Sequence, residues 1–177
     1  MLNSLNLFIF ENLRQRKSIK KESLSKNPFY LRRMKEEDLP NVLEIEQVSF
    51  PNPWHKMTFI GEILNHPISF PLVVVHGVQE RVMGYIIFWH IHDDVQINNI
   101  AVHPDFRRLG IGEAVVNMVL NKVRMEGARF IALEVRPSNF AARALYNKLG
   151  FEVLGIKENY YFRPQEHAFI MGKRLSQ

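Results

Sequence analysis

Cysteine is absent from this chain of 177 residues. Its absence excludes disulfide bonds, a thiol nucleophile and any zinc or iron–sulfur site built on cysteine ligands. Long hydrophobic runs are also missing, since the longest, Phe70–Val75, is far too short to cross a bilayer. In the N-terminal segment the positive charges follow the apolar stretch Leu5–Phe10, which is the wrong order for a signal peptide. We therefore expect a cytoplasmic protein without a membrane span.

The excess of positive charge is unevenly distributed. The chain has a formal net charge of +5, and six basic residues stand against two acidic ones within residues 1–28. The remainder, residues 29–177, is nearly neutral and is long enough to bury the core of one domain. We expect residues 1–28 to be a solvated basic extension, with weak contact to RNA or an acidic partner as the alternative. Nucleic-acid binding is not expected elsewhere.

Apolar spacing divides the domain into strands and helices in the order β α α β β β α β α β β. The first helix begins after Asp38, the expected N-cap, and a second spans His55–Asn65. The segment Phe50–Trp54, which contains two prolines, separates them. This order predicts a mixed α/β domain with helices on both faces of a largely antiparallel sheet.

One stretch, Ile97–Gly112, combines a strand, a glycine-containing loop and the start of a helix. Its sequence is INNIAVHPDFRRLGIG, and the helical spacing that follows continues to Met125. The first turn of a helix has unpaired N–H groups and partial positive charge, and glycines allow a phosphate to approach the backbone. The loop therefore predicts an anion site for a phosphate or pyrophosphate.

Two common phosphate motifs are missing from this loop. Glu113-Ala114 stand where a Walker loop needs Lys followed by Ser or Thr, and Val115 stands where a dinucleotide fingerprint needs its third glycine. The remaining pattern is Arg-x-x-Gly-x-Gly, Arg107–Gly112. An ordinary strand–turn–helix with a glycine-capped loop is the alternative interpretation of this motif.

The pattern of Arg107–Gly112 resembles the acetyl-coenzyme A loop of the GNAT superfamily of N-acetyltransferases. A second segment, Leu133–Phe151, contains LEVRPSN followed by ALYNKLGF. It is similar to the bacterial ribosomal-protein-alanine N-acetyltransferases, and the resemblance extends over Tyr30–Leu175. It implies the GNAT fold, a mostly antiparallel sheet of about six to seven strands. In that fold two strands part to form an acetyl-CoA cleft.

The resemblance also implies catalytic roles for two side chains. Glu134, near the end of its strand, is the expected general base for the acceptor amine, and the alternative is a carboxylate paired with Arg136 or Arg143. Tyr146 is the expected general acid for the departing thiolate, and the alternative is a core tyrosine with a hydrogen-bonded hydroxyl. A chain without cysteine suits direct attack, in which the enzyme forms no covalent intermediate.

The expected acetyl-CoA contacts follow from the same resemblance. Main-chain groups of one strand should bind the pantetheine arm, the glycine loop should hold the pyrophosphate, and Asn139 matches a coenzyme contact whose alternative is a helix cap. Glu113 departs from the pattern, because a basic residue is usual there. The full set of expected cofactor contacts is Ile100, Ala101, Val102, Arg107, Arg108, Leu109, Gly110, Ile111, Gly112, Glu113, Asn139 and Tyr146.

The acceptor implied by the resemblance is a protein amine, specifically the N-terminal alanine of a small-subunit ribosomal protein. Trp54, Tyr160 and Tyr161 are the candidate acceptor contacts. No metal is expected, because the pair His90 and His92 has no distant third ligand. Two alternatives remain: a GNAT that acetylates a small-molecule amine or a lysine side chain, and a non-catalytic acyl-CoA-binding module.

Overall fold

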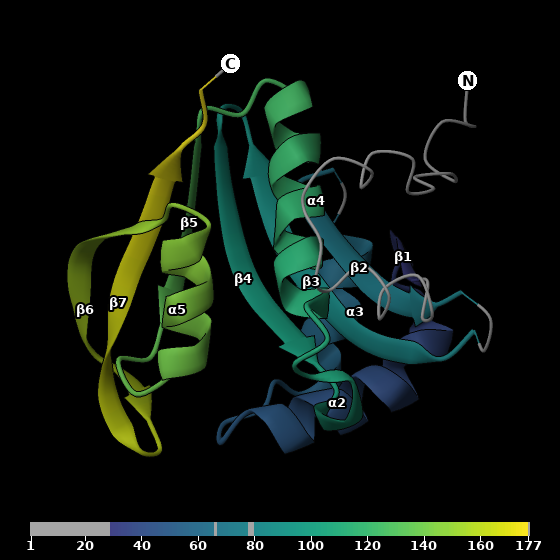
Figure 1. Cartoon of the computed structure of the whole chain (residues 1–177). Helices are drawn as coiled ribbons and strands as arrows, with labels where there is room; N and C mark the ends of the chain where they lie inside the picture. Colours follow the sequence, from purple (N-terminus) through teal and green to yellow (C-terminus); the bar gives the residue numbers. More distant parts are fainter. Residues whose placement is uncertain (1–28, 66, 78–79, 177) are drawn as a thin grey trace.

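A computed structural model describes residues 29–65, 67–77 and 80–176 (Figure 1). Its seven strands form one sheet in the order β1-β2-β3-β4-β5-β7-β6. The strands are β1 (Phe29–Arg33), β2 (Ser69–His76), β3 (Val82–Ile91), β4 (Asp94–Val102), β5 (Phe130–Val135), β6 (Glu152–Phe162) and β7 (Gln165–Arg174). The helices are α2 (Leu39–Ser49), α3 (Lys56–Leu64), α4 (Ile111–Met125) and α5 (Phe140–Lys148), with 3-10 turns η1 (Glu36–Asp38) and η2 (Pro104–Phe106).

This element order confirms the order predicted from apolar spacing, as well as the largely antiparallel sheet. All neighbouring strands pair antiparallel except β4 and β5, which are parallel and are joined through α4. The expected basic extension, residues 1–28, lies outside the described residues. No helix in the described part of the chain is long and apolar enough to span a membrane.

The sheet separates two hydrophobic cores. One core contains residues of α4 and α5, such as Val119 and Tyr146, packed on one face of the sheet. The other contains residues of α2 and α3, such as Val42 and Phe59, packed on the opposite face. Helices therefore cover both faces, as the sequence predicts. We refer to these as the α4 face and the α2 face.

A bulge in β4 changes which residues point to each face. Ile87 and Phe88 of β3 pair with Asn99 and Ile97, so Asn98 is an extra residue in β4. Ile97 belongs to the core on the α4 face, whereas Asn99 reaches α2 through its side chain. One inserted residue reverses the alternation and bends the bulged strand.

Pairing between β4 and β5 ends where this bulge occurs. Residues 94–97 pair with residues 130–133, and the last pair in register is Ile97 with Leu133. Beyond it β4 continues to Val102, while β5 continues to Val135 and turns toward α5. Figure 1 shows the two strands diverging. We call this region, residues 98–102 and 134–135, the β4–β5 fork; it confirms the predicted parting of the strands.

The residue predicted as the N-cap of α2 stands at that position, but its side chain forms an ion pair instead of a cap. Asp38 is at the N-cap position, but its side chain makes no cap hydrogen bond to α2. Instead Arg32 donates to both carboxylate oxygens, at 2.7 Å each, and the Lys35 N–H donates at 2.8 Å. Burial works to raise the pKa of Asp38, but these hydrogen bonds outweigh it and the pKa lies below its ordinary value.

We expect Asp38→Asn to destabilise the protein by about 1–3 kcal/mol at neutral pH, because Arg32 loses a charged partner. A carboxyl with a lowered pKa stabilises the fold above its ordinary pKa of about 4, and that contribution disappears as the pH falls through the lowered value. Urea unfolding at neutral pH and at about pH 3 should therefore show the difference between wild type and variant shrinking in acid.

Glu37→Gln is the matched control, since Glu37 is exposed in the same turn. It should leave the pH dependence of stability unchanged. A difference between wild type and Asp38→Asn that stays constant across this pH range would contradict the assignment.

Candidate active site

The glycine loop leads from η2 into the first turn of α4. Gly110 is the N-cap residue of α4, with a φ of +79°, and Arg108 also has a positive φ of 65°. A Cβ at Gly110 would meet no atom within 4 Å, so the space beside this backbone is open. The first N–H groups of a helix have no partner within the helix. The loop thus offers an anion the first-turn amide donors of α4, at the positive end of a helix dipole.

Arg107 holds this loop against the end of β4. Its Nε donates to the Val102 carbonyl at 2.9 Å, and a second guanidinium nitrogen donates to Ser49 Oγ at 2.9 Å. The side chain therefore links the loop to both β4 and α2. A direct contact of Arg107 with a phosphate remains a prediction, as do the contacts expected of the other loop residues.

The main chain of β4 presents part of its hydrogen-bonding groups to the fork. The His103 N–H donates to the Met83 carbonyl at 2.8 Å, which identifies His103 as a hydrogen-bonded partner of β3. Alternation along an antiparallel ladder then directs the N–H and C=O groups of Ala101 toward β3 and those of Ile100 and Val102 toward the fork. Among the three expected pantetheine contacts, Ile100 and Val102 thus have the suitable main-chain direction.

Glu134 lies on β5 at the fork, and its side chain is 23% exposed. Gln96 of β4 donates to its Oε2 at 2.7 Å, and the Lys157 ammonium of β6 lies 3.5 Å from its Oε1. Its strand neighbours Leu133 and Val135 belong to the core on the α4 face, so Glu134 points to the α2 face. One oxygen of the carboxylate is therefore oriented by an amide while the other lies near a cation.

The pairing of Glu134 with Arg136 or Arg143, which the sequence left open, is not what the structure shows. Arg136 lies over the ring of Tyr161, 3.9 Å from its centroid, and donates to the Pro164 carbonyl at 3.1 Å. Arg143 donates to the Pro137 carbonyl at 2.7 Å. Both guanidinium groups therefore hold turns of the chain in place.

Tyr146 lies on the other side of the sheet from Glu134. It is 5% exposed, belongs to the core on the α4 face and packs against Phe151 with ring centroids 5.6 Å apart. Burial, together with the nearby Tyr161, raises the pKa of its phenol. The hydroxyl consequently keeps its proton at neutral pH, as a proton donor must.

The sequence matches known proteins over most of the described region. A model of the acetyltransferase (GNAT) family matches residues 39–151. The chain belongs to the GNAT family. A Bacillus subtilis (strain 168) protein named "Putative ribosomal protein bS18-alanine N-acetyltransferase" is 39% identical over 141 residues, which are 80% of this chain and 92% of that protein. The ribosomal protein bS18-alanine N-acetyltransferase of Salmonella typhimurium is 36% identical over 78% of this chain and 93% of its own length.

Structural comparison gives the same result. The crystal structure of the ribosomal-protein-S18-alanine N-acetyltransferase from Escherichia coli matches with a TM-score of 0.76 and 30% sequence identity. The match covers 84% of this chain and 95% of that one. Family and fold together establish that the chain is an N-acetyltransferase with the GNAT fold.

The acidic residue that departs from the GNAT loop pattern has a partner in the structure. Glu113, in the first turn of α4, accepts a hydrogen bond at 2.6 Å from Lys148 in the last turn of α5. This ammonium compensates the negative charge that Glu113 places beside the glycine loop. The departure therefore leaves the local charge balanced.

Asn139 acts as a helix cap in this GNAT structure. Its Oδ1 accepts the Ala142 N–H at 3.1 Å at the start of α5. The capping interpretation of Asn139 is thus what the geometry shows, and a contact with coenzyme remains a prediction.

The expected acceptor contacts occupy two separate places. Trp54 ends the connector between α2 and α3 and packs on Phe59, with ring centroids 5.6 Å apart. Tyr160 and Tyr161 pack edge to face on β6, with ring centroids 4.9 Å apart. Burial is the main cause, and the neighbouring Tyr160 the second, that raises the pKa of Tyr161 to about 12. The connector nevertheless reaches the β6–β7 hairpin, because Asn52 Nδ2 donates to the Arg163 carbonyl at 2.9 Å.

Sequence reasoning missed three polar residues near the fork: Gln96, Lys157 and Glu46. Gln96 and Lys157 contact Glu134 from other strands, and nothing in the local pattern pairs them with it. Glu46 had a usable signal, since it lies four residues after Val42 on the inward face of α2. Its burial, at 1% exposure, marks it as a candidate for a specific role.

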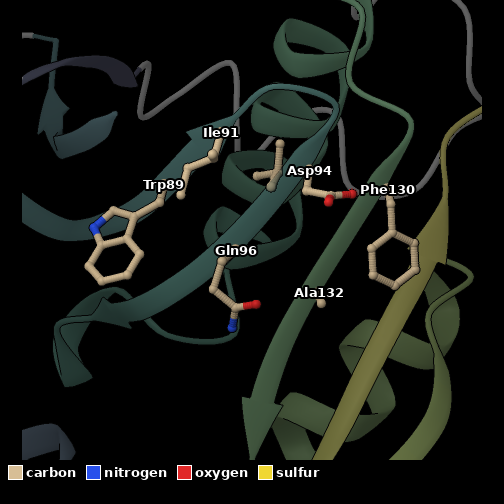
Figure 2. A pocket seen from close by; sticks show the side chains of 7 residues that line it. Trp89, Ile91, Asp94, Gln96, Phe130 and Ala132 are labelled. Carbon is tan, nitrogen blue, oxygen red and sulfur yellow. The ribbon is translucent and has the colours of Figure 1, made fainter. Parts of the chain in front are cut away.

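A surface hollow of about 230 Å³ adjoins the paired part of β4 and β5 (Figure 2). It is lined by Trp89, Ile91, Asp94, Val95, Gln96, Phe130 and Ala132. Figure 2 shows Gln96 between Trp89 and Ala132, and the same Gln96 donates to Glu134. The hollow is therefore connected to the fork through one side chain, and the glycine loop does not line it.

Within residues 29–65, 67–77 and 80–176, no group of three or more acidic or histidine side chains is arranged to hold a metal ion. His90 instead lies 3.6 Å from the Glu126 carboxylate and packs beside Phe70.

Gly84 allows β3 to approach β4 at the fork. A Cβ at this position would lie 2.6 Å from the Ala101 carbonyl oxygen and 3.2 Å from the Val102 Cα, both backbone atoms. We expect Gly84→Ala to destabilise the protein by about 1–3 kcal/mol in denaturant unfolding, because the backbone of β4 must shift.

Gly61→Ala is the matched control, since a Cβ there meets nothing within 4 Å on the exposed side of α3. It should stabilise by about 0.5–1 kcal/mol through helix propensity. Equal stability of Gly84→Ala and wild type would show that the strands tolerate the side chain.

Proposed function

We propose that this chain is an acetyl-CoA-dependent N-alpha-acetyltransferase that acts on the N-terminal alanine of a ribosomal protein. The observation that carries the proposal is the β4–β5 fork, which has an anion loop at one end and a carboxylate, Glu134, on its α2 face. The names of relatives that are 36–39% identical supply the acceptor. Their alignments cover more than nine-tenths of the relatives' own lengths.

The residues around the fork fit acetyl-CoA. The open space at Gly110 and the first-turn amides of α4 suit the pyrophosphate, in the loop Arg107–Glu113. The pantetheine arm takes hydrogen bonds from the fork-facing main chain of Ile100 and Val102. Acetyl-CoA, when bound there, supplies an activated acetyl thioester.

The two catalytic side chains lie on opposite faces of the sheet, which suits entry of donor and acceptor from opposite sides. Glu134, on the α2 face, removes the proton from the acceptor amine, directly or through one water. Main-chain N–H groups of β4 stabilise the negative charge that develops on the thioester oxygen. Tyr146, on the α4 face, donates its proton to the departing sulfur while the new C–N bond replaces the C–S bond.

The acceptor wall is formed by Trp54 on one side and by Tyr160 and Tyr161 on the other. The Asn52 hydrogen bond to the Arg163 carbonyl brings the connector and the hairpin into contact beside the fork. Aromatic side chains at this place suit a short peptide N-terminus, since they provide contact area with a polar edge.

Thiol release from acetyl-CoA in the presence of an acceptor panel tests the proposed function. The panel contains peptides that begin with Ala, the same peptides with an acetylated N-terminus, lysine-containing peptides and polyamines. We expect turnover with free Ala-starting peptides and none with the blocked ones. Turnover on polyamines or lysine alone would reject the proposal, and coenzyme binding without any turnover would favour a non-catalytic binding module.

We expect Glu134→Gln to reduce kcat/KM by about 10²–10⁴-fold, because the amide cannot accept the amine proton. The rise of the rate with pH should weaken, while acetyl-CoA binding measured by calorimetry persists. Glu158→Gln, an exposed carboxylate on the same strand as Lys157, is the control and should keep the wild-type profile. An unchanged pH profile in Glu134→Gln would count against its role as base.

A further inference from the structure

Glu46 is a buried carboxylate that the proposed mechanism does not use. It lies on α2 with 1% exposure, and three donors from three different segments face its two oxygens. The Trp54 N–H donates to Oε1 at 2.7 Å, the Tyr85 hydroxyl donates to Oε2, and Asn99 Nδ2 lies 3.3 Å from both oxygens. All three partners are donors, as an ionised carboxylate requires.

One of these segments is the connector, which contains Trp54, one side of the acceptor wall. The Phe50 N–H donates to the main-chain carbonyl of Glu46 at 3.0 Å, and the Trp54 N–H donates to its side chain. The first bond is the main-chain bond that ends α2, whereas the second belongs to the Glu46 side chain, which therefore fixes the Trp54 end of the connector. Between these two bonds, Asn52 reaches the β6–β7 hairpin.

The other two segments are β4, which forms one side of the fork, and its neighbour β3. Asn99 is the first residue of β4 after the bulged Asn98, and Tyr85 pairs with Ala101 across β3 and β4. Glu46 thus joins the connector to the part of β4 whose main chain faces the fork. No other described carboxylate links the connector to β4.

Burying the Glu46 carboxylate has an electrostatic cost, which its hydrogen bonds oppose. Burial raises the pKa of Glu46, although the hydrogen bonds from Trp54, Tyr85 and Asn99 favour its ionised form. A buried carboxylate stabilises a fold less than well-packed apolar residues of similar volume do. Its contribution here is geometric, because a charged acceptor with several donors fixes the direction of each.

We infer that Glu46 is a positioning residue for acetyl transfer, which fixes the Trp54 side of the acceptor wall relative to the fork-facing backbone of β4. This inference rests on the proposed function, since it assigns the connector to the acceptor. The amine then reaches the fork in a fixed orientation, and small displacements of reacting groups reduce rates strongly.

The chain contains a matched control for this residue. Glu62 on α3 is also buried, at 8% exposure, and its Oε2 accepts hydrogen bonds from Ser69 Oγ at 2.6 Å and Trp89 Nε1 at 2.8 Å. These partners belong to β2 and β3, so the side-chain hydrogen bonds of Glu62 reach neither the connector nor β4. Glu46→Gln and Glu62→Gln therefore make the same chemical change in similar surroundings.

In Glu46→Gln the side chain has one acceptor oxygen, whereas in the wild type the three donors share two carboxylate oxygens. The Tyr85 hydroxyl can turn and accept, but either the Trp54 N–H or the Asn99 amide loses part of its bonding. We expect Glu46→Gln to raise the acceptor KM and lower kcat so that kcat/KM falls about tenfold or more, with the acetyl-CoA Kd within about twofold of wild type. Glu62→Gln should leave all three parameters near wild type.

Denaturant unfolding of both variants separates positioning from stability. If they lose similar stability and have the same kinetic parameters, the inference is overturned. It is also overturned if Glu46→Gln weakens acetyl-CoA binding as much as it weakens acceptor turnover.

If the wild-type protein acetylates no acceptor, the proposed function is rejected. Amide hydrogen exchange then tests separately whether Glu46 positions the connector and β4. Exchange should become faster in residues 50–55 or 98–102 in Glu46→Gln and not in Glu62→Gln. Unchanged exchange in both segments would overturn the inference without reference to activity.

Discussion

The structure of this acetyltransferase depends on the early end of one parallel strand pairing. β4 and β5 share only the pairs from Asp94 with Phe130 to Ile97 with Leu133, and the bulge at Asn98 bends β4 away from its neighbour. The main-chain groups that β5 does not pair remain available to a ligand. The fork is therefore a consequence of one extra residue in β4. Because Gly84 has no side chain, β3 stays close to β4 beyond the bulge.

Side-chain alternation, which this bulge reverses within β4, distributes the proposed site residues over both faces of the sheet. Before it, β4 directs its apolar side chains toward α4, and after it Asn99 is directed toward α2 and Glu46. On β5, the alternation places Glu134 on the α2 face, whereas Tyr146 of α5 is buried on the α4 face. The proposed base and the proposed acid therefore lie on opposite faces of the sheet, an arrangement that suits a reaction joining two substrates.

Three carboxylates, two of them beside the site and one at the start of α2, are each matched by a cation from another element. Lys148 compensates Glu113 beside the glycine loop, Lys157 lies near Glu134, and Asp38 binds Arg32 at the start of α2. Glu46 differs from these, since its partners are neutral donors in a nearly inaccessible place. A buried charge held only by directed hydrogen bonds fixes geometry more than it adds stability.

Local patterns in the sequence determined the order of the elements, the glycine loop before α4 and the position of Glu134 at the end of a strand, because periodicity, caps and glycines act within a few residues. They did not reveal Gln96 and Lys157 beside Glu134, or Lys148 beside Glu113. Nor did they reveal the three donors around Glu46, which lie 8, 39 and 53 residues after it in the sequence. Only the tertiary structure decided these contacts, because they depend on strand register and on a bulge that reverses the faces of β4.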